Sequence, residues 1–202
     1  MVRSRAETMA ETREKLIAAA RRTFAASGFA ESAMEDITAE AGLTRGALYH
    51  QFGGKKGLLE AVIEQIDAEM TERLSVISSR ASSTWAALID ELVAYVAMAA
   101  EPEIQRIVLL DGPAVLGEPS QWPTQTACVR NTRRHIERLI EEGVVQPVDA
   151  EATARLVSAA ALGASLWVAN AEDPHESSRR VSQTLPVLLS GLLTRDQQVV
   201  ER

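Results

Sequence analysis

A segment near the N-terminus carries side chains that could contact nucleic acid. It offers a hydroxyl, a guanidinium, a phenol and an imidazole, on Thr44, Arg45, Tyr49 and His50. Arginine can bind guanine or phosphate, and threonine can reach a phosphate or a thymine methyl group. Gly46 lies among them, and its lack of a side chain would let a helix backbone approach DNA closely. This segment therefore indicates recognition of DNA rather than bond cleavage.

The elements that must position these side chains are two short helices joined by a tight turn. Gly42 stands where the end of a helix favours a left-handed residue. Thr44 can cap the next helix through its hydroxyl. On that helix Leu48 and Phe52 fall on the inner face, opposite the polar side chains. Such a pair of helices forms a helix-turn-helix, whose second helix enters the major groove of DNA.

The pattern continues on both sides of this pair of helices. The run GFAESAMEDITAEAGLTRGALYHQFGGKKGLLEAV follows an apolar stripe formed by Leu16, Ile17, Ala20 and Phe24. The chain thereby resembles the tetracycline-repressor (TetR/AcrR) family of bacterial transcriptional regulators between residues 11 and 63. The resemblance implies an all-α fold. We expect a three-helix DNA-binding head at residues 1–56 and a helical ligand-binding and dimerisation body at residues 57–202.

The resemblance also implies individual DNA contacts. Thr44, Tyr49, His50 and Lys55 match positions that commonly contact DNA, and Ser32 matches a hydroxyl that contacts phosphate. The predicted DNA-binding set is Ser32, Thr44, Arg45, Gly46, Tyr49, His50 and Lys55. The chain departs from the family pattern at Ala33, Gly54 and Lys56, which bears on single phosphate contacts and not on the motif.

The distribution of charge agrees with DNA binding through one face. The net charge of the chain is −7, but residues 1–56 hold nine Lys or Arg against seven Asp or Glu. The remaining residues hold 12 basic against 21 acidic side chains. An acidic body repels phosphate, which argues against a protein that coats DNA without regard to sequence.

Apolar spacing predicts about nine helices along the chain and no strands. Residues 1–10, with Arg3 and Arg5, are expected to be unstructured without DNA, or to form an arm that contacts phosphates. A loop or broken helix is expected at residues 111–119, which contain two Gly and two Pro. The predicted helices cover residues 12–27, 32–41, 44–52, 55–79, 85–99, 104–110, 123–142, 150–171 and 176–193.

The resemblance implies that the last two long helices pair with their copies in a second chain. The predicted dimer interface contains Leu156, Ala160, Gly163, Ala164, Trp167, Val181, Leu185 and Leu188. The alternative is that these helices pack only within one chain. A two-fold dimer would place its recognition helices roughly 34–36 Å apart and would read a palindromic operator.

A pocket for a small-molecule effector is expected among the fourth to seventh predicted helices, between residues 55 and 142. The candidates to line it are Trp85, Arg106, Asp111, Trp122, His135 and Trp167. Arg106 and Asp111 are expected to form a buried polar pair or to be surface charges. The alternatives for the others are core packing for the tryptophans and an exposed face for His135.

Other classes of function are disfavoured by the composition. Three histidines, none at ligand spacing, predict no metal site, and no cofactor is expected. The single cysteine, Cys128, excludes an internal disulfide and is expected to be a small apolar filler. No apolar run approaching the ~20 residues of a membrane span is recognised, nor a signal region, so a cytoplasmic location is expected.

The sequence therefore predicts a regulator that binds specific DNA, acts as a homodimeric repressor, and is released from its operator by an effector. An activator, or a regulator that has lost ligand control, is the alternative. A helical enzyme is a remote one, because no pair of nucleophile and base is visible.

Overall fold

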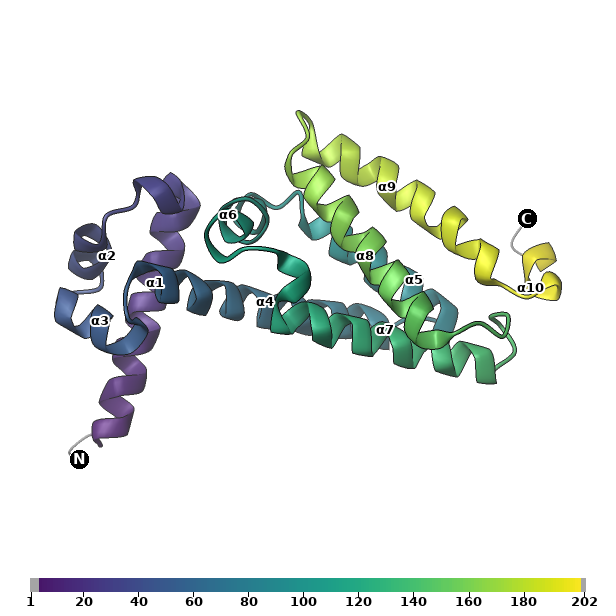
Figure 1. Ribbon diagram of the computed structural model, residues 1–202, viewed down its shortest axis with the longest axis horizontal. Helices are drawn as coiled ribbons and strands as arrows, with labels where there is room; N and C mark the ends of the chain where they lie inside the picture. Colours follow the sequence, from purple (N-terminus) through teal and green to yellow (C-terminus); the bar gives the residue numbers. More distant parts are fainter. Residues whose placement is uncertain (1–3, 201–202) are drawn as a thin grey trace. The chain divides into compact units, whose positions relative to one another are not determined.

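The computed structural model describes the backbone of residues 4–200 and the side chains of residues 4–197, and this part of the chain consists of helices joined by turns and loops (Figure 1), with one isolated antiparallel bridge between Val145 and Leu193. Ten α-helices lie within residues 4–200, where about nine helices were predicted for the chain. Packing divides the chain into two units. The first contains Met1–Ala68 and Pro102–Gly117, and the second contains Glu69–Glu101 and Glu118–Arg202. The boundary predicted after residue 56 separates two functions and not two packing units, so it stays a prediction.

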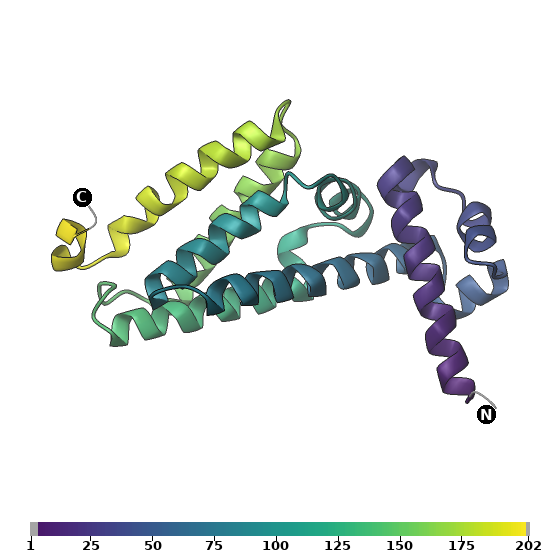
Figure 2. The same ribbon diagram turned by 180° about the vertical axis from the view of Figure 1, so that it is seen from behind.

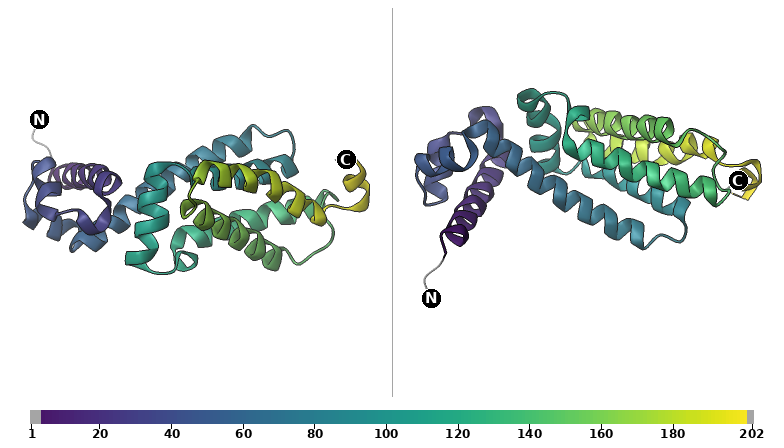
Figure 3. Two further views of the ribbon diagram at one scale, coloured as in Figure 1. Left: turned by 90° about the horizontal axis from the view of Figure 1, so that it is seen from above. Right: turned by 60° about the horizontal axis from the view of Figure 1, so that its bottom comes forward.

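The first unit contains the predicted three-helix head. Its helices are α1 (Arg5–Glu31), α2 (Met34–Glu40), α3 (Arg45–Phe52) and the first part of α4 (Lys55–Ser79), as the left view of Figure 3 shows. Leu16, Phe24, Ile37, Leu48 and Leu58 are fully buried and form the centre of this unit. The apolar spacing of the sequence predicted these inward positions because residues three or four apart share a helix face.

Helix α1 begins earlier than predicted. The Ser4 hydroxyl accepts a hydrogen bond from the Glu7 amide (3.1 Å), and the Glu7 carboxylate accepts one from the Ser4 amide (2.7 Å). This reciprocal capping box starts a helix that includes Arg5. The expectation that residues 5–10 lack structure is therefore wrong. Arg3 lies outside the described residues.

The segment 102–117 belongs to the first unit and packs on α1. It forms a π-helix, η1 (Ile104–Asp111), over the short helix predicted at residues 104–110, followed by the short helix α6 (Gly112–Leu116) where a loop or broken helix was predicted. Arg21 on α1 donates two hydrogen bonds of 2.7 Å to the Glu103 carboxylate. This ion pair joins stretches of chain that are 82 residues apart.

Gly28 interrupts α1 with a left-handed φ of 77°, at the place where the sequence predicted that the helix ends. The residues around it are held by η1. The Arg106 guanidinium donates to the Ser27 carbonyl (3.1 Å), and the Asp111 carboxylate accepts from the Phe29 amide (2.7 Å). Asp111 also lies 3.7 Å from Arg106, so one carboxylate serves both partners.

We expect Asp111→Ala to lower the free energy of unfolding by about 1–3 kcal/mol, because the partly buried Phe29 amide would lose its acceptor. Urea unfolding followed by circular dichroism measures the change. Asp90→Ala, at an exposed position of the second unit, is the control and should unfold like the wild type. Equal midpoints for the two variants would contradict a stabilising role for Asp111.

The second unit is a bundle of long helices. It contains the end of α4 with α5 (Thr84–Met98), α7 (Pro123–Glu141), α8 (Ala150–Ala169) and α9 (Pro174–Leu189), seen from behind in Figure 2. Short turns η2 (Pro119–Gln121) and η3 (Ser190–Leu192) and the helix α10 (Arg195–Val200) complete it. Its core is built from Leu88, Leu92, Ile136, Leu139, Val145, Val157, Ala161, Leu185 and Leu189.

Hydrogen bonds stabilise the chain at both ends of α9. The Gln146 amide donates to the Leu192 carbonyl and the Thr194 amide to the Val144 carbonyl, both at 2.9 Å. At its other end, α9 is capped by Asp173. Hydrogen bonds from Arg179 hold the pKa of Glu176, in the first turn of α9, below its ordinary value.

Helix α8 contradicts the expectation that no apolar run in the chain approaches the length of a membrane span. It is 20 residues long, and its most apolar 18-residue window has a mean hydropathy of 1.4, so its length and composition would allow it to cross a membrane. It packs against α5, α7 and α9, and 44% of that window is buried inside the protein. A core helix of a helical bundle has the same properties.

Candidate nucleic-acid interface and ligand pocket

The turn between α2 and α3 has the geometry that the sequence predicted. Gly42 adopts a left-handed φ of 65°, and the Leu43 amide donates to the Thr38 carbonyl at 2.8 Å. The Thr44 hydroxyl then accepts from the Ala47 amide (3.2 Å) and caps α3. Both local predictions, the left-handed glycine and the threonine cap, are confirmed.

Helix α3 buries one side and exposes the other. Leu48 is fully buried, whereas the Tyr49 side chain is 48% exposed. The structure brings together the predicted DNA-binding residues of this helix and its N-cap, all of them exposed: Thr44, Arg45, Gly46, Tyr49 and His50. A helix that presents polar and aromatic side chains in this way can offer them to base edges.

Two of the predicted DNA-binding cations have partners within the first unit. The Arg45 guanidinium forms an exposed ion pair with Glu35 on α2 (2.5 Å). The Lys55 ammonium lies 4.4 Å from the centre of the Phe29 ring and donates to the Ala30 carbonyl (3.4 Å). Lys55 is thus held beside the end of α1 rather than extended into solvent.

Ser32 differs from the other predicted DNA-binding residues because it is buried. Its hydroxyl donates to the Gly28 carbonyl at 2.5 Å, and Ser32 caps the C-terminus of α1. Helix α2 begins at Met34 with Ala33 as its N-cap and without a side-chain cap, close to the start that was predicted at Ser32 or its neighbours. The departure from the family pattern at Ala33 explains the missing cap, since alanine has no side-chain acceptor.

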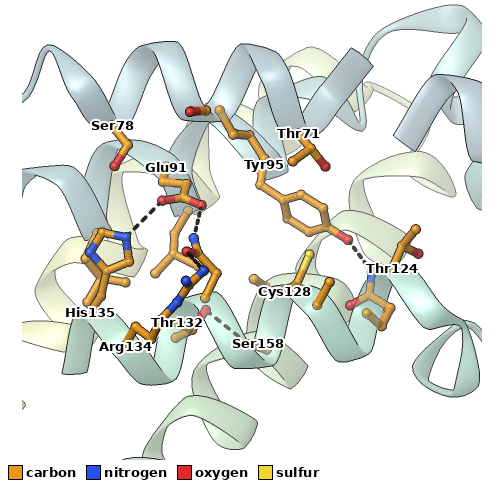
Figure 4. A pocket seen from close by; sticks show the side chains of 18 of the residues that line it. Thr71, Ser78, Glu91, Tyr95, Thr124, Cys128, Thr132, Arg134, His135 and Ser158 are labelled. Atoms are coloured by element: carbon orange, nitrogen blue, oxygen red, sulfur yellow. Dashed lines mark hydrogen bonds and ion pairs between the residues drawn. The ribbon is translucent and has the colours of Figure 1, made fainter. Parts of the chain in front are cut away.

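The second unit contains a cavity of about 530 Å³ lined by residues of α4, α5, α7 and α8 (Figure 4). At one end the Glu91 carboxylate accepts a hydrogen bond from the Asn131 amide group (2.8 Å) and lies 3.4 Å from Nε2 of His135. At the other end the Gln125 amide group donates to the Tyr95 hydroxyl (3.0 Å). The cavity volume is in the range of small-molecule sites.

Of the six predicted pocket residues, His135 lines this cavity and the other five do not. Arg106 and Asp111 lie in the first unit, where they contact each other and α1. Trp85 packs against the core of the second unit, and Trp167 is exposed on α8. Trp122 precedes α7, and its buried Nε1 has no hydrogen-bond partner among the described residues.

Four polar residues of the cavity were not predicted from the sequence: Glu91, Tyr95, Gln125 and Asn131. A signal for them was present, because Glu91 and Tyr95 are four residues apart on α5, and Asn131 and His135 are four apart on α7. Such pairs share a helix face. Polar pairs that flank an apolar stripe could have indicated the pocket. Cys128, expected to be an apolar filler, also lines the cavity.

The predicted dimer residues separate into two groups. Leu156 and Leu188 are 72% and 66% exposed. Ala160, Gly163 and Trp167 are also exposed on α8, and Ala164 on the same helix is half-buried. Leu185, in contrast, is buried in the core of its own chain, and Val181 packs against that core. Val187, which was not predicted, is exposed next to Leu188. The exposed apolar residues of the predicted dimer interface do not pack into the core of their own chain.

Comparisons with known proteins extend over both units. Residues 16–62 match the bacterial regulatory proteins of the tetR family, and residues 85–192 match the tetracyclin repressor-like C-terminal domain. A TetR-family transcriptional regulator from Pectobacterium atrosepticum has the same fold, with a TM-score of 0.87 and 49% identity. That alignment covers 96% of this chain and 99% of the other.

Two further relatives are more distant. The HTH-type transcriptional regulator SrpR of Pseudomonas putida is 29% identical over 116 residues, which cover 55% of this chain. This chain spans about half of SrpR, 52% of its length. RolR, in a complex with resorcinol, shares the fold with a TM-score of 0.70 at 20% identity, over 96% of this chain and 92% of RolR. Since the family matches cover both the helix-turn-helix and more than half of the chain, the protein belongs to the TetR family and is a DNA-binding transcriptional regulator, not an enzyme.

Proposed function

We propose that this regulator is a homodimeric repressor that binds a palindromic operator through α3 and leaves it when a small molecule enters the cavity of the second unit. The proposal assigns DNA binding to residues 1–56, effector binding and dimerisation to residues 57–202, and action to the cytoplasm, where the DNA is.

The observation that carries this proposal is the continuity of α4. This single helix begins at Lys55, directly after the recognition helix and its glycine turn, and its later residues Thr71, Leu74 and Ser78 line the cavity. A ligand that favours one placement of α4 would shift the population of DNA-binding states, provided that it binds the two states with different affinity. RolR, which was solved with resorcinol, supports a ligand role for this fold.

The exposed apolar residues of α8 and α9 support the dimer. Leu156, Trp167, Val187 and Leu188 would otherwise remain in contact with water, and clustered exposed apolar side chains mark interaction surfaces. Small residues at Ala160 and Gly163 would allow close approach of two helices. Two-fold symmetry then gives two recognition helices for two half-sites.

The test of DNA recognition is Tyr49→Ala. We expect operator affinity to fall about tenfold or more, because one well-placed side chain is worth about 1–3 kcal/mol of recognition. The helical content and the dimer should be unchanged because Tyr49, which is 48% exposed, is not part of the buried core. Fluorescence anisotropy measures the affinity, on an inverted repeat taken from the DNA beside the gene.

Met9→Ala, at another exposed apolar side chain of the first unit, is the control and should bind like the wild type. If Tyr49→Ala and the wild type bind the operator with equal affinity, the assignment of α3 to the DNA interface is contradicted. A reporter assay with and without effector separates the proposed repressor from an activator or a regulator without ligand control.

A further inference from the structure

We propose that the cavity of the second unit binds an organic cation, a molecule that carries a protonated amine, and that Glu91 recognises the amine. This inference rests on the proposed function of the cavity as the effector site and names the chemical class of the effector.

The first step is the position of Glu91. Its side chain projects from α5 into the cavity and is only 20% exposed (Figure 4). The carboxylate accepts one hydrogen bond from Asn131 and faces the His135 imidazole. An ionised carboxylate can accept about four hydrogen bonds, so acceptor capacity remains for a ligand.

The second step is the charge of the lining. The lining contains the carboxylate of Glu91, the guanidinium of Arg134 and the imidazole of His135. Arg134 is an exposed residue whose guanidinium donates to the Asn131 side-chain oxygen (3.2 Å). Because solvent and salt screen an exposed charge more than a partly buried one, the Glu91 carboxylate dominates the inside of the cavity.

The third step is the cost of displacing water. A neutral apolar ligand would remove water from the Glu91 carboxylate and supply neither a charge nor a hydrogen bond in its place, and removing water from a charged group without compensation is unfavourable. An anionic ligand would add repulsion to this cost. An ammonium group supplies the opposite charge and up to three hydrogen-bond donors. The Ser78 hydroxyl lies on the same side of the cavity and offers a further acceptor (Figure 4).

The remaining lining defines the rest of the ligand. Leu74, Leu92 and Ala161 supply apolar surface. Tyr95 follows Glu91 by one helical turn, about 6 Å along α5, and its hydroxyl is already oriented by Gln125. The matching ligand has an amine, an apolar or aromatic body, and a second polar group toward Tyr95. A phenol joined to an amine by a short carbon chain has this form.

Three probes with a common skeleton test the inference on the full-length protein. Tyramine carries the protonated amine, tyrosol carries a hydroxyl in its place, and 4-hydroxyphenylacetate carries a carboxylate. Isothermal titration calorimetry should show saturable tyramine binding, about tenfold tighter than tyrosol, and the weakest binding for the carboxylate. Absence of saturable tyramine binding, or tighter binding of either other probe, would overturn the inference.

Glu91→Gln removes the charge with little change of shape. It should weaken tyramine binding about tenfold while tyrosol binding changes by less than about threefold. Glu118→Gln, an exposed position of the same unit outside the cavity lining, is the matched control and should bind both probes as the wild type does. Equal loss for tyramine and tyrosol in Glu91→Gln would show a structural defect and contradict charge recognition.

Operator release is measured separately by adding tyramine to the complex of protein and DNA. If tyramine binds through Glu91 but leaves operator binding unchanged, the inference on ligand class stands and the proposed release mechanism fails. If the operator is released by the carboxylate probe and not by tyramine, the release mechanism stands and the inference fails.

Discussion

Gly57→Ala is expected to lower the free energy of unfolding by about 2–4 kcal/mol and to weaken operator binding with it. A Cβ atom at Gly57 would lie 2.1 Å from the carbonyl oxygen of Phe52 and 3.2 Å from its carbonyl carbon. Phe52 is the last residue of α3, so the obstacle is backbone that cannot rotate away as a side chain does. Either the end of the recognition helix or the start of α4 must move.

Gly46→Ala is the matched control for this substitution. A Cβ atom there has only the Thr44 hydroxyl oxygen nearby, at 3.7 Å, which is an ordinary contact. Alanine inside a helix is favoured over glycine by about 0.5–1 kcal/mol, so this variant should be as stable as the wild type or more stable. Its operator affinity should still fall if Gly46 gives α3 its close approach to DNA.

Urea unfolding and fluorescence anisotropy on the operator measure these two variants side by side. The expected pattern is a loss of stability and affinity in Gly57→Ala, and a loss of affinity alone in Gly46→Ala. A Gly57→Ala protein that unfolds at the wild-type urea concentration would show that the contact with Phe52 relaxes without cost.

Leu156→Glu combined with Leu188→Glu is expected to abolish the dimer and to reduce operator affinity about a hundredfold or more. Both side chains are largely exposed in one chain, so the fold of the monomer should survive. In the proposed dimer, two-fold symmetry would bury four new carboxylates without partners, which is strongly unfavourable. A monomer also binds only one half-site, so the binding free energy that the second recognition helix would contribute is lost.

Analytical ultracentrifugation measures the oligomeric state in this experiment. Val76→Glu, on α4, introduces the same charge at another exposed apolar side chain (42% exposed) and should leave the dimer intact. Gly163→Leu is a milder probe, since a Cβ atom at Gly163 meets no other atom within 4 Å in one chain. A double variant that remains dimeric would move the interface away from α8 and α9.

The sequence predicted the helix-turn-helix well because its determinants are local. Gly42 and Thr44 specify the turn by their own conformation and hydrogen bonding, and Leu48 marks the buried side of α3 by its spacing. The early start of α1 was also readable, because Ser4 and Glu7 have the spacing of a capping box.

The candidate pocket was predicted poorly because its determinants are distant in the chain. Arg106 and Asp111 were expected in the pocket, but they contact residues of α1 that lie about eighty positions earlier. Helical periodicity says which face a residue occupies and not which helix lies opposite. The same limit explains Leu185, which the spacing placed correctly on an apolar face that turned out to be the core of its own chain.

The division of the chain between the two units limits which segments can be exchanged between related proteins. The chain crosses from one unit to the other near residues 68, 101 and 117, so the first unit is not one continuous N-terminal piece. A graft of residues 1–68 alone would leave behind the acceptor of the Phe29 amide and the ion-pair partner of Arg21. To transplant the head of this protein, two segments of sequence are therefore needed. The first is residues 1–68, and the second is residues 102–117, which form η1 and α6.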